Sequence, residues 1–152
     1  MFKSWHLAEV FVSLQGEGVW QGTQMLFLRT VGCNVGVKKN AEQVNAICTS
    51  WDGREFTCDT DYRKHLTLTE DQLDKLIQEF PGTHVCVTGG EPLLHKELLS
   101  YIAGSCKISV KMLHIETSGT LPIVFEGYHA ADPDIWITVS PKKDCLSDPY
   151  DL

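Results

Sequence analysis

Apolar side chains recur at helical spacing in two segments of the chain. The first opens at Thr69, where Gln72 three residues later completes a capping-box pattern, and a Pro-Gly pair at residues 81–82 ends it. The second begins at about Leu94 and reaches a C-cap at Gly104. Each segment predicts an amphipathic helix with one buried face. The expected buried residues are Leu73, Leu76, Ile77 and Phe80 in the first, and Leu94, Leu98, Leu99 and Ile102 in the second.

Four short, mostly apolar runs predict buried strands, because each closes at or near a glycine or a Ser-Pro pair. They cover residues 25–30, 84–88, 111–117 and 135–139. Since strands and helices alternate, the predicted fold class is α/β, with a mostly parallel sheet and crossover helices. Ligands bind such sheets at the carboxyl ends of the strands. Polar motifs follow all four predicted strands, so we expect one site along this edge of the sheet.

Composition and charge indicate one soluble domain. The 152 residues include 43% hydrophobic and 22% charged residues, and the net charge is −7. No run of Lys or Arg exceeds two residues, so neither nucleic acid nor a membrane surface is an expected partner. The chain starts without a signal peptide, and no window approaches the roughly 18 consecutive apolar residues of a spanning helix. We therefore expect a single cytoplasmic domain covering residues 1–152.

Six cysteines without a secretion signal are more typical of metal binding or catalysis than of disulfides. Cys33, Cys48 and Cys58 fall in residues 33–62, which show no sustained period and predict a long functional loop. Zinc sites favour CxxC pairs, which this chain lacks, so zinc with His65 as a fourth ligand is the weaker alternative. Three thiolates without a fourth suggest a metal cluster with one open coordination position.

The other cysteines and two charged residues carry less specific signals. Cys86 and Cys106 are expected to be small buried hydrophobic residues, and Cys145 lies in a polar tail. Arg29 interrupts an apolar strand and is costly to bury unless it is paired, so a bound carboxylate is an expected partner. Glu116 follows another apolar run, where it is either a ligand-binding carboxylate or a buried structural one.

Short motifs also occur in a fixed order along nearly the whole chain. The first are EVF at residues 9–11, SLQGEG at 13–18 and GCN at 32–34. The later ones are CDT at residues 58–60, TGGEP at 88–92, ETSG at 116–119 and VSPK at 139–142. In this combination the sequence resembles 7-carboxy-7-deazaguanine synthase, a radical S-adenosylmethionine (SAM) enzyme family of queuosine and deazapurine biosynthesis.

The resemblance implies an incomplete (β/α) barrel with a cluster-binding loop at about residues 32–62. Cys33, Cys48 and Cys58 would ligate a 4Fe–4S cluster and leave its fourth iron to SAM. Mg²⁺ would be bound by Thr60, with Asp59 beside it. The implied SAM contacts are Gly89, Gly90, Glu91, Ser118, Ser140 and Lys142.

By the same resemblance, the substrate is 6-carboxy-5,6,7,8-tetrahydropterin. It would be surrounded by Gln15, Glu17, Arg29, Thr88 and Glu116. A radical generated from SAM would take a hydrogen from C6 of the pterin, after which the ring contracts, ammonia is lost and SAM can be regenerated. The catalytic residues would be Arg29, which fixes the substrate carboxylate, and Glu116, which binds the pterin edge together with Gln15. The family also implies a homodimer and an electron donor such as flavodoxin.

Two departures from the family leave alternatives open. Nine residues separate Cys48 from Cys58, more than the usual spacing, so Cys48 is the least secure ligand. Trp51 and Phe56 in this insertion either cover the cluster or SAM, or only pack the loop. The family also continues well past the VSPK motif, which leaves open a catalytically inactive binding or regulatory relative. The enzymatic alternative is a glycyl-radical activating enzyme. The QGEG motif and Thr60 argue against it.

Overall fold

The computed structural model describes residues 3–38, 45–61, 63, 65–104, 110–124 and 133–145. A six-stranded sheet is formed by β1 (Ser4–Leu14), β2 (Gln24–Thr30), β5 (Leu66–Thr69), β6 (His84–Gly89), β7 (Met112–Thr117) and β8 (Asp134–Val139). A separate antiparallel hairpin consists of β3 (Ile47–Thr49) and β4 (Glu55–Thr57). The helices are α1 (Glu70–Glu79), α2 (Lys96–Gly104) and the 3-10 turns η1 (Gly18–Trp20) and η2 (Pro92–Leu94).

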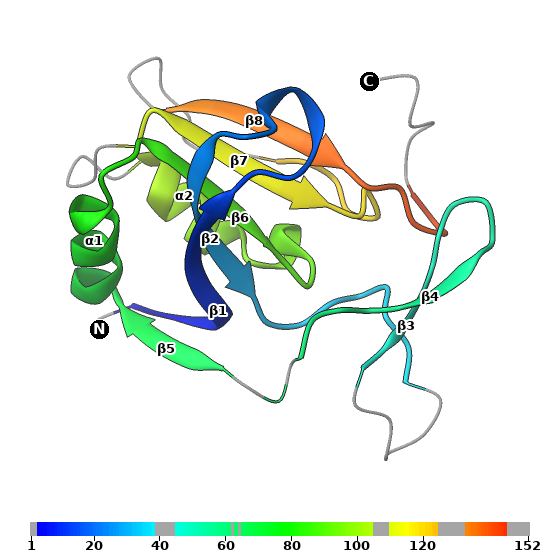
Figure 1. Ribbon diagram of the computed structural model, residues 1–152. Coiled ribbons are helices and arrows are strands. Elements are labelled where there is room, and N and C mark those ends of the chain that lie inside the picture. Colours follow the sequence, from blue (N-terminus) through cyan, green and yellow to red (C-terminus); the bar gives the residue numbers. More distant parts are fainter. Residues whose placement is uncertain are drawn as a thin grey trace.

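The strand order of the large sheet is β5-β1-β2-β6-β7-β8. Strands β2, β6, β7 and β8 are parallel, whereas β1 and β5 pair antiparallel on one side. The carboxyl ends of the parallel strands point toward the β3–β4 hairpin, which is set apart from the sheet (Figure 1). The predicted α/β fold with a mostly parallel sheet is therefore confirmed, with two antiparallel strands added.

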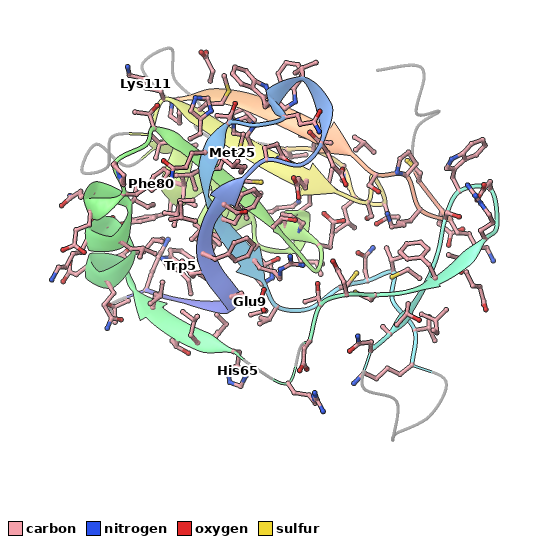
Figure 2. The ribbon with its side chains drawn as sticks, in the orientation of Figure 1. Trp5, Glu9, Met25, His65, Phe80 and Lys111 are labelled. Atoms are coloured by element: carbon pink, nitrogen blue, oxygen red, sulfur yellow. The ribbon has the colours of Figure 1, made fainter. Side chains whose placement is uncertain are left out.

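One face of the sheet carries the main apolar core. Inward residues of the strands, such as Leu28, Val87 and Ile115, are fully buried and pack against both α-helices. Trp5 and Phe80 lie beside α1 and join the same cluster (Figure 2). Burial of this face provides most of the driving force for folding, because apolar area removed from water dominates domain stability.

The opposite face of the sheet is apolar in the middle of the strands and polar at their carboxyl ends. Met25, Phe27 and Cys86 form a small apolar cluster, against which Phe11 packs with its ring stacked 5.1 Å from that of Phe27. Because side chains alternate across a strand, the residues two positions further along β6 and β7 lie on this same face. Thr88 is one of these residues, and it lies at the functional edge. This face therefore runs from an apolar middle to a polar edge.

Both predicted helices exist, and the first begins as expected. The Thr69 side chain accepts from the backbone N–H of Gln72, and the Gln72 side chain accepts from the backbone N–H of Thr69. The second helix, expected from about Leu94, begins at Lys96. The expected burial of Leu94 was wrong, because this side chain is 49% exposed at the end of η2. Pro92 favours this separate turn, since it fixes φ and lacks an N–H.

Four strands did not emerge from the apolar pattern. Strands β1 and β5 were not predicted, and β3 and β4 lie in the segment expected to be a loop throughout. The prediction for Cys106 falls outside the described residues. Neither α-helix in the described part of the chain is both long and apolar enough to cross a membrane.

Candidate active site

The three cysteines of the predicted cluster converge on one place. Cys33 follows β2, Cys48 lies on β3 and Cys58 follows β4, and all three line a cavity of about 320 Å³. Cys48 is buried, and burial raises the pKa of its thiol to about 11, with further contributions from the neighbouring Cys58 and Cys33. The nearby ammonium of Lys142 acts in the opposite direction. The hairpin therefore brings Cys48 to the other two thiols despite its unusual spacing.

The three thiols line one cavity but are not gathered around one point. Within the described ranges, no three His, Cys, Asp or Glu side chains are gathered closely enough to hold one metal ion. The thiols instead share the wall of a cavity with room for a group of several atoms. A cationic group bound in this cavity would lower the pKa of the thiols. It would thereby favour the thiolate forms, which are the ones that bind metal.

A second, larger cavity of about 430 Å³ adjoins the thiols at the carboxyl edge of the sheet. Its volume lies within the ~300–1,000 Å³ of typical ligand sites. Twelve of the predicted substrate, SAM and metal residues line it: Glu17, Cys33, Cys48, Cys58, Asp59, Thr88, Gly89, Gly90, Glu116, Ser118, Ser140 and Lys142. The structure therefore brings most of the predicted site to one cavity.

The turn at Gly89 and Gly90 forms the wall beside the thiols. Gly89 has φ +118, and a side chain there would place its Cβ 2.4 Å from the backbone nitrogen of Thr30. The N–H of Gly90 donates to the carbonyl of Thr30 at 3.2 Å, and that of Glu91 donates to the carbonyl of Gly32 at 3.0 Å. Only glycine suits this position, because it lacks a Cβ and accepts positive φ. The turn is thereby fixed directly next to the Cys33 segment.

Glu91 lies behind this wall and not on the cavity surface. Its side chain is fully buried, and its carboxyl group accepts from the backbone N–H of Leu93 at 3.1 Å and from the hydroxyl of Thr117 at 2.6 Å. It also accepts from both the backbone N–H and the hydroxyl of Ser118. Since a carboxyl group offers about four acceptor positions, these donors occupy its capacity. Glu91 thus supports the Ser118 wall from beneath.

The opposite wall comes from the end of β8 and from the hairpin. The Lys142 ammonium donates to the backbone carbonyl and the hydroxyl of Ser140, at 2.8 and 2.7 Å, and lies 5.4 Å from the ring centre of Phe56. Ser50 forms a β-bridge with Lys142. The β3–β4 hairpin is consequently docked against the β8 end, as Figure 1 shows. Phe56 lines the cavity, whereas Trp51 is 58% exposed and does not.

Three of the predicted substrate residues, Glu17, Thr88 and Glu116, line the cavity. Gln15 donates from Nε2 to Oε1 of Glu116 at 2.9 Å, and the backbone N–H of Glu17 donates to Oε1 of Gln15 at 3.2 Å. Gln15 itself is buried and does not reach the cavity surface. Glu116 faces the cavity with a carboxyl group whose orientation is set by Gln15.

The remaining predicted residues form a network around Arg29. Its Nη1 donates to the hydroxyl of the buried Thr60 at 2.9 Å and lies 3.8 Å from Oδ1 of Asp59. Its Nε forms an ion pair with Glu9 at 3.2 Å. The guanidinium therefore faces the oxygen atoms that a Mg²⁺ ion would need, and the two positive charges would repel. In this arrangement Thr60 and Asp59 would bind Mg²⁺ only if Arg29 turned away from them, and Arg29 does not line the main cavity.

Some lining residues were missed or left open by the sequence. Thr138 lies two residues before Ser140 on β8, so the alternation of side chains along a strand could have placed it on this face. Thr117 and Thr57 adjoin predicted residues. Phe56 was left open by the sequence, and the structure places it on the cavity wall. Val35 carries no local signal, because its position depends on how the loop folds.

Comparisons with known proteins agree with this geometry, although no family model matches the chain. A protein from Synechocystis is 34% identical over 139 residues, covering 91% of this chain and 56% of the relative, and its name is 7-carboxy-7-deazaguanine synthase. The chain is homologous to the 7-carboxy-7-deazaguanine synthases. Proteins of that name from Methanospirillum hungatei and Bacteroides thetaiotaomicron are 34% and 30% identical, over 76% and 89% of this chain.

A solved structure supports the same relationship. The crystal structure of QueE from Escherichia coli matches with a TM-score of 0.59 and 26% identity, covering 94% of this chain and 62% of that one. The resemblance read from the motifs is therefore confirmed. The chain spans about half the length of the synthases, between 43% and 59% of the three relatives named above.

Proposed function

We propose that this chain is a radical SAM lyase that converts 6-carboxy-5,6,7,8-tetrahydropterin to 7-carboxy-7-deazaguanine with loss of ammonia, in deazapurine (queuosine) biosynthesis. The observation that carries the proposal is the cavity lined by three thiols, the Gly89–Gly90 turn and Glu116 together. The names of the homologous synthases support the product. The glycyl-radical activating enzyme has no comparable support.

The proposal includes the architecture. The parallel strands β2, β6, β7 and β8, with helices against one face and cavity residues at their carboxyl ends, are what an incomplete (β/α) barrel requires. The similarity to QueE is in keeping with this arrangement. We regard the described residues as one radical SAM domain whose cluster-binding segment includes the β3–β4 hairpin.

Two cofactors fit the cavity walls. Cys33, Cys48 and Cys58 would hold a 4Fe–4S cluster, and the adjoining cavity would take SAM against Gly89, Gly90, Ser118, Ser140 and Lys142. When bound, the reduced cluster and SAM would supply the radical chemistry of the reaction. At the glycine turn the backbone allows SAM to approach closely, and hydroxyl and ammonium groups lie opposite it. The Phe56 ring adds an apolar part to the cavity wall. Glu91 maintains the Ser118 wall and does not contact SAM directly in this assignment.

The substrate would lie deeper, against Glu116 and Thr88, with Glu17 at the rim. The Glu116 carboxyl group has acceptor positions left after its bond from Gln15, so it suits the N–H groups along the edge of a pterin. Arg29 would bind the substrate carboxylate only if it leaves Glu9 and Thr60. Thr60 and Asp59 would bind Mg²⁺ on the same condition, because Arg29 faces both of them in this structure. From the family we also expect that the protein forms a homodimer and that a donor such as flavodoxin reduces its cluster. We expect it to be located in the cytoplasm.

The decisive functional test is turnover by the reconstituted chain. After anaerobic loading with iron and sulfide, the protein is supplied with SAM, a strong reductant and 6-carboxy-5,6,7,8-tetrahydropterin, and the product is followed by mass spectrometry. We expect 7-carboxy-7-deazaguanine and ammonia from the wild type and from Cys145→Ala, but neither from Cys58→Ala. Intact binding of SAM and pterin without any product would instead establish a binding role.

A further inference from the structure

The turn between β1 and β2 reaches the cavity on one side and a group of aromatic rings on the other. Glu17 in this turn lines the cavity at the carboxyl ends of the parallel strands. Three residues later, the ring centre of Trp20 lies 5.3 Å from that of His84, the first residue of β6. It also lies 5.5 Å from the ring centre of His114 on β7 and 6.0 Å from that of Trp136 on β8. The turn therefore lies across the face of the sheet that the α-helices do not cover (Figure 1).

We propose that Trp20 is a positioning residue that anchors the turn at residues 15–23 and thereby holds Gln15 and Glu17 in place for substrate. This inference rests on the proposed function, in which Gln15 orients Glu116 and Glu17 lies at the rim of the substrate site. Trp20 lies outside the sequence motifs and does not line the cavity. It would act only through the turn that carries it.

The middle of the turn at residues 15–23 benefits from an anchor. Backbone hydrogen bonds fix its two ends, where the N–H of Gln15 donates to the carbonyl of Thr23 and the N–H of Gly22 to the carbonyl of Gln15, both at 2.8 Å. Between these ends lies η1, none of whose three residues is fully buried. Glycines at positions 16, 18 and 22 raise the entropic cost of ordering this stretch. A tryptophan is suited to offset that cost, because it offers a large contact area with few rotatable bonds.

The rings that receive Trp20 belong to the strands that carry the site. His84 and His114 are joined by a hydrogen bond of 2.9 Å between Nδ1 and Nε2, which fixes the two imidazoles relative to each other. His114 lies two residues before Glu116 on β7, and the side chain of Glu116 accepts from Gln15 at 2.9 Å. The turn is consequently held against β7 at two points, by Trp20 at His114 and by Gln15 at Glu116. Loss of the first contact should loosen the second.

The first test measures the anchoring directly and needs no turnover. Amide hydrogen exchange of the apoprotein is followed by nuclear magnetic resonance in Trp20→Ala and in Val19→Ala, whose side chain in the same η1 turn is 75% exposed. In Trp20→Ala we expect the amides of Gln15 and Gly22 to exchange about tenfold faster, because the turn opens locally, while that of Val87 in β6 keeps its rate. Val19→Ala should match the wild type.

Two results of this exchange experiment would overturn the inference. Unchanged rates at Gln15 and Gly22 in Trp20→Ala would mean that the turn needs no anchor. Equal acceleration at Val87 would mean that Trp20 only stabilises the core. If Trp20→Ala does not fold, the same comparison is made with Trp20→Leu, which keeps apolar volume but removes the ring.

The second test asks whether the anchor matters for the substrate. A loosened turn must be ordered when the pterin binds, so Trp20→Ala should raise the KM for the pterin by about tenfold and leave the KM for SAM unchanged. Nε1 of Trp20 has no hydrogen-bond partner within the described residues, so a phenyl ring can replace the indole. Trp20→Phe should therefore restore the KM to within about threefold of the wild type. A parallel change in the KM for SAM, or equal impairment of both variants, would contradict a positioning role.

The two tests separate this inference from the proposed function. If the wild type binds the pterin without making product, the same comparison is made on its dissociation constant. If the wild type neither turns over nor binds the pterin, the proposed function is wrong and the positioning inference fails with it. If turnover is normal but the exchange rates of Gln15 and Gly22 do not change in Trp20→Ala, only the inference fails.

Discussion

The carboxyl group of Glu91 accepts both the backbone N–H and the hydroxyl of Ser118, and so ties the turn after β6 to the end of β7. Thr117 and Leu93 donate to the same group. All of this lies in the interior, where polar groups are costly unless they are paired. The two walls that would enclose SAM are therefore connected by one buried side chain, and the stability of the site should depend on it.

We expect Glu91→Ala to destabilise the protein by about 3 kcal/mol, because it leaves several buried donors unsatisfied. Ser118→Ala should cost about 1 kcal/mol, since the backbone N–H of residue 118 keeps its bond to Glu91. Urea denaturation followed by circular dichroism measures both values. Equal, small losses would show that the buried network contributes little and that Glu91 is available for a ligand.

The stability of the protein should fall in mild acid through His114. Burial is the main reason that the pKa of His114 lies near 4 instead of 6.5, with His84 acting in the same direction and Glu116 against it. The unfolded chain takes up this proton below about pH 6.5, whereas the folded chain does so only near pH 4, so the free energy of unfolding drops between these values. The loss attributable to His114 is at most roughly 3 kcal/mol.

This pH dependence is measured by denaturation at intervals from pH 7 to pH 4. His114→Gln should flatten the profile, because glutamine does not titrate. His6→Gln is the matched control, since its exposed ring only bonds Thr67 near the surface. An unchanged slope in His114→Gln would assign the acid sensitivity to other groups.

The hairpin offers a matched pair of aromatic residues. Phe56 lines the cavity beside Lys142, whereas Trp51 is exposed and outside it. Phe56→Ala should weaken SAM binding by about three- to tenfold, as expected for the loss of an aromatic contact, and Trp51→Ala should leave it unchanged. Isothermal titration of the reconstituted protein with SAM measures both. If the two variants behave alike, the hairpin does not contribute to the SAM site.

Arg29→Ala separates two roles of this residue. If Arg29 leaves its internal partners to bind the substrate carboxylate, the variant should bind the pterin at least tenfold more weakly and SAM normally. Glu9→Gln removes a partner of Arg29 outside the cavity and serves as the comparison. Equal losses of pterin and SAM binding in Arg29→Ala would show that the residue mainly supports the Thr60 segment.

The parts of the fold that could be predicted were those with strong local patterns. The helix after Thr69 combines a capping box with a clear apolar face, and both were observed. Strand β1 was missed because its inward residues change at an irregularity between Leu7 and Glu9, which breaks the simple alternation. The β3–β4 hairpin was missed because each strand has only 3 residues, too few for a clear alternation, and because the two strands pair with each other inside the loop.

The candidate site also contains residues that local sequence patterns could place and others that they could not. Cys33, Gly89 and Ser140 were placed correctly at one edge because each follows a parallel strand. The location of Cys48 could not be derived from its spacing, since only the folded hairpin brings it to the other thiols. Arg29 was expected to await a ligand, but tertiary contacts with Glu9 and Thr60 already satisfy much of its charge. Such long-range pairings leave no local trace in the sequence.

The central claim is that three thiols hold an iron–sulfur cluster with one iron open to SAM. It is tested most directly by electron paramagnetic resonance of the protein, reconstituted anaerobically with iron and sulfide and then reduced, with and without SAM. We predict a reduced 4Fe–4S signal that changes when SAM is added, retained in Cys145→Ala and lost in Cys33→Ala, Cys48→Ala and Cys58→Ala. No cluster signal in the wild type, or one that SAM leaves unchanged, would contradict the account.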